Sequence, residues 1–116
     1  MSITRHDTGP RMSKAVVHGN TVYLAGIVAN EPKGKDMTAQ TKDILAQIDG
    51  FLAKAGTDKS KLLSANIWVT DMKEFAAMNA VWDAWVSPGN TPARATVEAK
   101  LAAPGYHVEI MVVAAK

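Results

Sequence analysis

Alternating apolar and polar residues predict five short strands along the chain. A two-residue Gly19-Asn20 loop separates the first two, which is typical of a β-hairpin. The second strand of this hairpin is almost wholly apolar, and we expect it to lie inside the sheet or under another subunit. Residues 1–12 are mainly polar and predict a surface arm or the beginning of an edge strand. The predicted strands are Ser13–His18, Thr21–Val28, Leu63–Thr70, Thr91–Glu98 and Val108–Ala115.

Two further segments carry apolar residues at helical spacing. Asp36 or Thr38 can cap the first helix, and Gly56 ends it. Asp71 can cap the second, which the Ser87-Pro88-Gly89 turn ends. We interpret the tryptophans of the second helix as core residues rather than a stacking platform. The apolar faces comprise Ile44, Leu45, Ile48, Phe51, Leu52 and Ala55 in the first helix and Phe75, Met78, Trp82 and Trp85 in the second.

The order ββαβαββ predicts one α+β domain over residues 1–116, with two helices on one face of a mostly antiparallel or mixed sheet. Such a two-layer domain leaves the second face of its sheet open. The strand segments Val22–Val28 and Val108–Val113 are more apolar than a solvated face requires. We therefore expect an oligomer in which another subunit covers this face.

Composition narrows the function classes. Of the 116 residues, 47% are hydrophobic and 21% are charged, as in a globular protein with a core. The chain has no cysteine, no apparent secretory signal and no run of apolar residues long enough to span a bilayer, so we expect a cytoplasmic protein. A net charge of +2 with dispersed lysines argues against a nucleic-acid partner.

Motifs for several common chemistries are missing. His6, His18 and His107 have no partners at metal-ligand spacing, so no metal site is expected. The chain also lacks a P-loop, a dinucleotide glycine motif and a GxSxG nucleophile elbow. The remaining candidates are single charged residues within strands.

Arg94 is the first such candidate, because it lies near the start of a predicted strand, two residues after Pro92. Pro92 fixes its own φ and favours an extended Thr91, which constrains where the arginine lies. A guanidinium group presents five donors in a planar fork that suits a carboxylate or a phosphate. The alternative is an ordinary surface or interface salt bridge, and the pattern alone leaves both open.

Glu109 is the second candidate, because it shares a face of an apolar strand with Met111 and Val113. A carboxylate in such surroundings needs a partner or a proton, and it could serve as a general acid or base. A structural ion pair, or a charge that discourages edge-strand association, is an equal alternative. If the last two strands are neighbours, Arg94 and Glu109 could share one site.

Several motifs resemble those of the RidA/YjgF family, and together they cover nearly the whole chain. The most specific are Pro92-Ala93-Arg94-Ala95-Thr96-Val97-Glu98 and the later Val108-Glu109-Ile110. The others are Gly19–Gly26 in the hairpin, Gln40–Gly56 in the first helix, Ile67–Phe75 and Met78-Asn79.

The resemblance implies a chorismate-mutase-like subunit of a homotrimer, with three clefts between subunits. It also implies an enzyme that hydrolyses reactive enamines and imines, such as 2-aminoacrylate and 2-imino acids, to 2-keto acids and ammonia. Active members of the family need no metal or organic cofactor. The expected partners are therefore a small imino or keto acid and two further copies of the chain.

By position in the family motifs, Arg94 would clamp the substrate carboxylate and Glu109 would activate water or relay a proton. Thr96 stands where the family often has cysteine, and Gly26 and Ala25 would line the cleft. Asn79 also matches a recurrent family position, which we interpret as structural.

Two further residues, at the N-terminus and in the hairpin, differ from those of archetypal family members. Arg11 replaces a tyrosine after Gly9-Pro10, and Ala25 replaces a serine. The cleft lining therefore differs and leaves the substrate open. Two other functions compete with deamination: a module that binds a small carboxylate in the same cleft without turnover, and an endoribonuclease, against which the low net charge argues.

Overall fold

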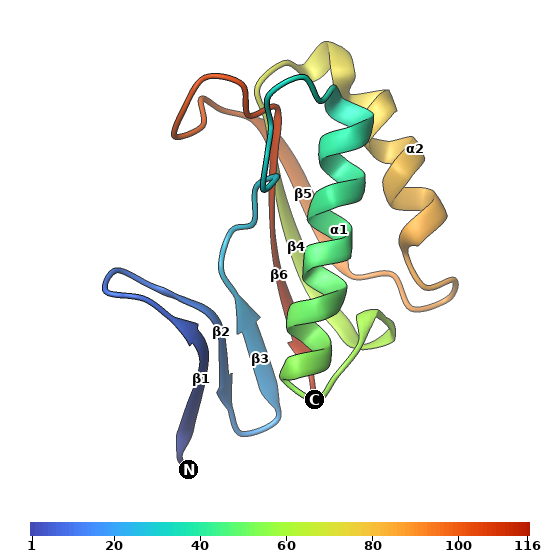
Figure 1. Ribbon diagram of the computed structural model, residues 1–116. Helices are drawn as coiled ribbons and strands as arrows, with labels where there is room; N and C mark the ends of the chain where they lie inside the picture. The colour runs from blue at the N-terminus through green and yellow to red at the C-terminus, as the bar shows by residue number, and fades with distance from the viewer.

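The computed structural model describes residues 1–116 as one six-stranded sheet with two helices on the same side (Figure 1). The strand order is β1-β2-β3-β6-β4-β5, so β5 and β1 are the two edges. Only β4 and β5 are parallel, and all other neighbours are antiparallel. The elements are β1 Ile3–Thr8, β2 Ser13–His18, β3 Thr21–Leu24, α1 Met37–Lys54, β4 Leu62–Val69, α2 Phe75–Trp85, β5 Ala93–Glu98 and β6 Val108–Ala115, with short 3₁₀ turns at Lys59–Lys61 and Met72–Glu74.

The structure confirms the predicted two-layer α+β class and extends it by one strand. Of the two alternatives for residues 1–12, the edge strand is correct, since β1 pairs with β2 along its length. The predicted strand Thr21–Val28 is too long: β3 ends at Leu24, and only Ile27 pairs again, in an isolated bridge to Ile110. The chain leaves the ladder at Ala25-Gly26, which frees this short segment for other contacts.

The helix ends follow from local chemistry. The Asp36 side chain caps α1 by accepting a hydrogen bond from the Ala39 N–H at 2.9 Å. Gly56, with φ of +86°, ends the helix, and the neighbouring N–H groups turn back onto the carbonyls of its last turn. Asp71 caps the 3₁₀ turn before α2 rather than α2 itself, through the Lys73 N–H. The predicted caps are therefore confirmed, with that one shift.

The core lies between the helices and one face of the sheet. Every second residue of β6 is buried, and the same face of each neighbouring strand contributes aliphatic side chains. Gln40 and Thr41 are the fully buried polar residues of α1. The largest buried apolar side chains are Ile27, Met37, Ile44, Leu45, Ile48, Leu52, Ile67, Met78 and Ile110.

The second face of the sheet carries apolar side chains with no cover in the single chain. Tyr23 is 48% exposed and Val97 is 51% exposed, although each lies in the sheet rather than on a loop. Trp68 pairs with Val97 and Glu109 across the central strands of the same face. β3 is an interior strand, as predicted, and its second face is open within one chain. Neither helix is sufficiently long and apolar to cross a membrane.

Candidate functional site

Arg94 lies on edge strand β5 and points to the helix-bearing face, beneath α2. Its guanidinium carbon is 5.4 Å from the ring centroid of Trp82 and 5.9 Å from that of Phe75. It forms neither an ion pair nor a hydrogen bond within the chain, whose two salt bridges are Lys35–Asp43 and Lys54–Asp7. Within the subunit the salt-bridge interpretation of Arg94 is therefore wrong, and its donors are available to a ligand.

Two polar groups near Arg94 also lack partners. The Thr96 hydroxyl and the Asn79 carbonyl oxygen are buried and accept no hydrogen bond. Thr96 follows Arg94 on the same face of β5, because side chains alternate along a strand. Asn79 lies between Phe75 and Trp82 on one stripe of α2, which the aromatic contacts direct toward Arg94. These are groups that a polar ligand can satisfy, since buried polar atoms are normally paired.

Sequence reasoning missed Asn79 as a candidate and treated it as structural. Its position four residues after Phe75 and three before Trp82 was the available signal, because it places an amide on the apolar stripe of a helix. We refer to Arg94, Thr96 and Asn79, with their aromatic walls, as the arginine half-site.

Glu109 and Gly26 form a second group of candidate site residues, and Glu109 lies on the open face of the sheet. A Cβ atom on Gly26 would overlap the Glu109 carboxylate oxygen Oε2 and lie 3.0 Å from its carboxyl carbon. Only glycine permits this approach without a shift of the carboxylate. Glu109 forms no side-chain hydrogen bond or ion pair. Ala25 precedes Gly26 in the chain, and its N–H donates to Lys14 O of β2 at 2.9 Å. We refer to Gly26, Ala25 and Glu109 as the glutamate half-site.

The two half-sites do not meet within one chain. β4 lies between β5 and β6, so the last two strands are not neighbours and the condition for a shared site within one chain is not met. The pairing Trp68↔Val97 and Trp68↔Glu109 places Glu109 on the face of Val97, whereas Arg94 lies on the alternate face. A single subunit therefore presents an arginine on one side of its sheet and a glutamate on the other.

The concave surfaces of the isolated chain lie elsewhere. One is a groove of about 630 Å³ between α1 and α2, bordered by Ala80 and Trp85. The other, of about 670 Å³, lies along the loop between β5 and β6. Neither of these two surfaces includes Arg94 or Glu109.

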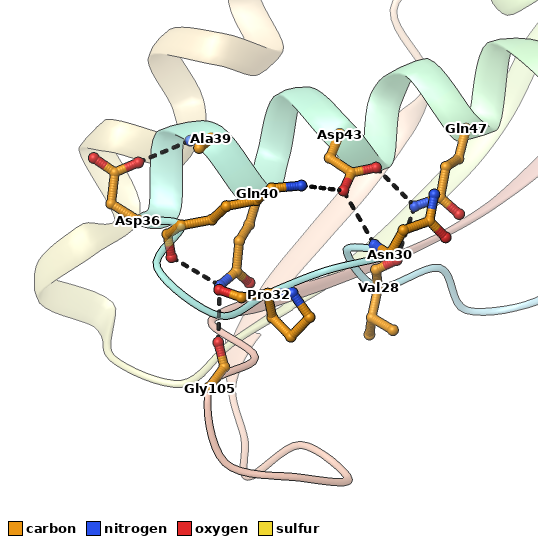
Figure 2. Close-up of polar contacts among 10 residues, drawn as sticks. Val28, Asn30, Pro32, Asp36, Ala39, Gln40, Asp43, Gln47 and Gly105 are labelled. Carbon is orange, nitrogen blue, oxygen red and sulfur yellow. Dashed lines mark hydrogen bonds and ion pairs between the residues drawn. The ribbon is translucent and has the colours of Figure 1, made fainter.

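Polar residues of α1 hold the segment that follows Gly26 (Figure 2). Asp43 accepts hydrogen bonds from the Asn30 N–H at 3.1 Å, from Lys35 Nζ at 3.1 Å and from Gln47 at 3.0 Å. Gln47 also donates to Val28 O at 2.9 Å. Partial burial raises the pKa of Asp43, but the hydrogen bonds from Lys35, Gln47 and Asn30 and the charge of Lys35 outweigh it, so the pKa lies below its ordinary value. The loop is thus anchored to a rigid helix.

Solved structures define the class to which this architecture belongs. A member of the YjgF protein family from Neisseria meningitidis matches with a TM-score of 0.96 and 48% identity, covering 100% of this chain and 96% of that one. A member of the YjgF/YER057c/UK114 family from Mycobacterium tuberculosis matches with a TM-score of 0.90 and 30% identity, over 99% of this chain and 100% of that one. The chain therefore has the YjgF-type fold.

Sequence comparison gives the family. Residues 4–116 match the family model described as endoribonuclease L-PSP. The RutC family protein YoaB of Escherichia coli is 48% identical over 115 residues, which is 99% of each chain. A RutC family protein of Haemophilus ducreyi is 42% identical over 97% of this chain and 96% of its own length. The chain belongs to the RidA/YjgF family, as its motifs predicted.

Proposed function

We propose that the protein hydrolyses reactive enamines and 2-imino acids, such as 2-aminoacrylate and its imine tautomer, to 2-keto acids and ammonia. The observation that carries this proposal is the unpaired guanidinium of Arg94, which lies against two aromatic rings of α2 at a sheet edge. A planar fork with five unused donors suits a bidentate carboxylate. The partners are then a small imino or keto acid and other copies of the chain, in the cytoplasm.

In this proposal, the site forms between subunits of a homotrimer. The open sheet face exposes apolar side chains such as Tyr23 and Val97, and burying them against another copy is favourable. A cyclic head-to-tail contact joins two different surfaces of the same chain. Such a contact can bring the arginine half-site of one subunit to the glutamate half-site of the next, which the fold of one chain prevents.

The chemistry divides between the two half-sites. Arg94 binds the substrate carboxylate, while the Thr96 hydroxyl and the Asn79 carbonyl offer hydrogen bonds to the polar atoms beside it. Glu109 accepts a proton from water as the water oxygen adds to the C=N carbon and the π electrons pass to nitrogen. Returning this proton to nitrogen gives a carbinolamine. Glu109 then passes the hydroxyl proton of the carbinolamine to nitrogen as the C=O bond forms, the C–N bond breaks and ammonia leaves. Water and imine are thereby converted to ketone and ammonia with no change of redox state.

Two other functions use parts of the same surface. A carboxylate-binding module needs only the arginine half-site, and the replacements at Arg11 and Ala25 alter the lining that a substrate would contact. The family model carries an endoribonuclease description, but the net charge of +2 offers little to a phosphate backbone. Deamination is preferred because it uses Glu109 and Gly26 as well as Arg94.

The test is a coupled assay in which an amino-acid dehydratase releases 2-aminoacrylate and keto-acid formation is followed. The protein should accelerate keto-acid release, and Arg94→Ala should abolish most of the acceleration. Arg94→Lys should also be impaired, because an ammonium group lacks the bidentate geometry. Lys61→Ala removes one positive charge from an exposed turn and is the control. Keto-acid binding without acceleration would favour the binding module, and RNA cleavage lost on Arg94→Ala would favour the nuclease.

A further inference from the structure

Gln40 is a fully buried amide on the first turn of α1, and all of its polar atoms are used. Its Nε2 donates to Gly105 O at 2.8 Å and to Lys35 O at 3.0 Å, with a longer contact to Pro32 O at 3.4 Å. Its Oε1 accepts from the His107 N–H at 2.9 Å. Figure 2 shows this side chain between the Pro32 and Gly105 carbonyls. One side chain thus connects three parts of the chain.

The partners of Gln40 belong to two loops that lead to the glutamate half-site. Residues 28–36 follow Gly26, and residues 99–107 precede Glu109 by one residue. Figure 1 shows both loops at the same end of the sheet. No direct hydrogen bond joins one loop to the other, and the backbone bridge Ile27–Ile110 is the next connection along the sheet. Gln40 is therefore the side-chain link between the two loops, next to the backbone bridge that flanks Gly26 and Glu109.

We propose that Gln40 is a positioning residue that fixes the approach of the Glu109 carboxylate to Gly26. This inference rests on the proposed function for its catalytic consequence, but its structural part does not. An amide is required because the site demands donors and an acceptor at once. Leucine or methionine would fill the space and leave the Gly105 and Lys35 carbonyls and the His107 N–H without partners.

Replacing Gln40 should affect turnover rather than binding of the substrate carboxylate. Gln40 is connected to the glutamate half-site, whereas Arg94 lies on the other face of the sheet and on an edge strand. Loss of Gln40 should therefore lower kcat and leave KM within about twofold, since the interaction lost would be one made in the transition state.

Gln40→Glu provides a readout that a purely structural role would not produce. A glutamate carboxylate at this position can accept the hydrogen bond from the His107 N–H but cannot donate one to the Gly105 and Lys35 carbonyls. The protonated carboxyl group can donate one hydrogen bond. Burial favours the protonated form, so this variant should recover activity as the pH falls, relative to the parent protein. Gln40→Met should lose activity by about tenfold at every pH, as expected for a fixed geometric change.

The experiment combines pH–rate profiles with amide chemical shifts of Gly26 and Glu109 for Gln40→Glu, Gln40→Met and the control Thr57→Val. Thr57 is also buried, and its hydroxyl donates to Ala115 O, at the opposite end of β6 from Glu109. We expect the amide shifts of Gly26 and Glu109 to change in both Gln40 variants but not in Thr57→Val. Activity should recover at low pH in Gln40→Glu alone.

Unchanged shifts at Gly26 and Glu109 in folded Gln40→Met would overturn the inference, as would equal shifts in Thr57→Val. If the parent protein has no deaminase activity, the proposed function fails, but the chemical shifts still decide the positioning role. Should Gln40→Glu fail to fold, Gln40→Met alone decides it through the same shifts and through the split between kcat and KM.

Discussion

Arg94 and Glu109 lie on opposite faces of one sheet, with β4 between their strands. Each is a charged side chain without an ion pair in its own subunit. An arginine and a glutamate in this relationship can cooperate only if different copies of the chain supply them. The open apolar face beside Glu109 provides a surface for such a contact.

Gly26→Ala should damage the glutamate half-site with little effect on folding. The added methyl group would overlap the Glu109 carboxylate and displace it. We expect kcat to fall by about tenfold or more, while the free energy of unfolding changes by about 1 kcal/mol or less, because a flexible side-chain end gives way. Steady-state kinetics and urea unfolding measure both.

Gly50→Ala is the control for that substitution. Gly50 lies within α1, and a Cβ there meets open space. This variant should be more stable than the parent by about 0.5–1 kcal/mol at unchanged activity. Full activity of Gly26→Ala would contradict the role given to the Glu109–Gly26 contact.

Thr96→Val should lower activity while leaving the protein equally or more stable. The substitution removes a buried hydroxyl that has no partner in the subunit and keeps the side-chain shape. Stability should stay equal or rise by about 1 kcal/mol, and kcat/KM should fall by about tenfold if the hydroxyl contacts the substrate. Thr4→Val on exposed strand β1 serves as the comparison. A less stable but fully active Thr96→Val protein would show that the hydroxyl has a structural role instead.

The fold class and the candidate Arg94 could be predicted from the sequence, because both depend on local patterns. Alternation predicted β2 and β6 to the residue, and helical spacing with caps predicted α1 and α2. The face on which Arg94 lies relative to Glu109 was not predictable in this way. It depends on β6 entering the sheet between β3 and β4, which is a long-range pairing with no local signal. The position of Asn79 on the apolar stripe of its helix could be read from the sequence, but its lack of a hydrogen-bond partner appears only in the packed structure.

Asp43→Asn should remove a pH-dependent contribution to stability. The folded-state pKa of Asp43 lies below its unfolded value, so folding favours the ionised form. The stabilisation is complete above the unfolded-state pKa and is lost as the pH falls through the folded-state pKa. At pH 7 the variant should be less stable by about 1 kcal/mol, and the two proteins should converge in strong acid.

Urea unfolding between pH 2 and pH 7 provides this measurement, on a scale where one pKa unit is about 1.4 kcal/mol. Asp83→Asn removes a carboxylate at an exposed position of α2 without a hydrogen-bond partner and is the control. A constant difference between Asp43→Asn and the parent would mean that packing, not charge, is what Asp43 contributes.

Val97→Asp should dissociate the oligomer. Val97 is a half-exposed apolar residue on the open face of edge strand β5, and burying an unpaired carboxylate there is strongly unfavourable. Sedimentation velocity should show the parent at three times the chain mass of 12.4 kDa and the variant near one chain mass. Met72→Asp, on an exposed 3₁₀ turn outside the sheet, should remain assembled. A parent protein that sediments as a monomer would contradict the shared site directly.

Subunit mixing tests the central claim most directly. Arg94→Ala and Glu109→Gln should each be nearly inactive, because each lacks one half-site in every cleft. Co-expressed in equal amounts as a random trimer, they should regain about one quarter of parental activity, since one ordered subunit pair in four supplies both intact halves. A mixture no more active than the separate variants, in trimers shown by mass spectrometry to contain both chains, would contradict a site built from Arg94 of one subunit and Glu109 of the next.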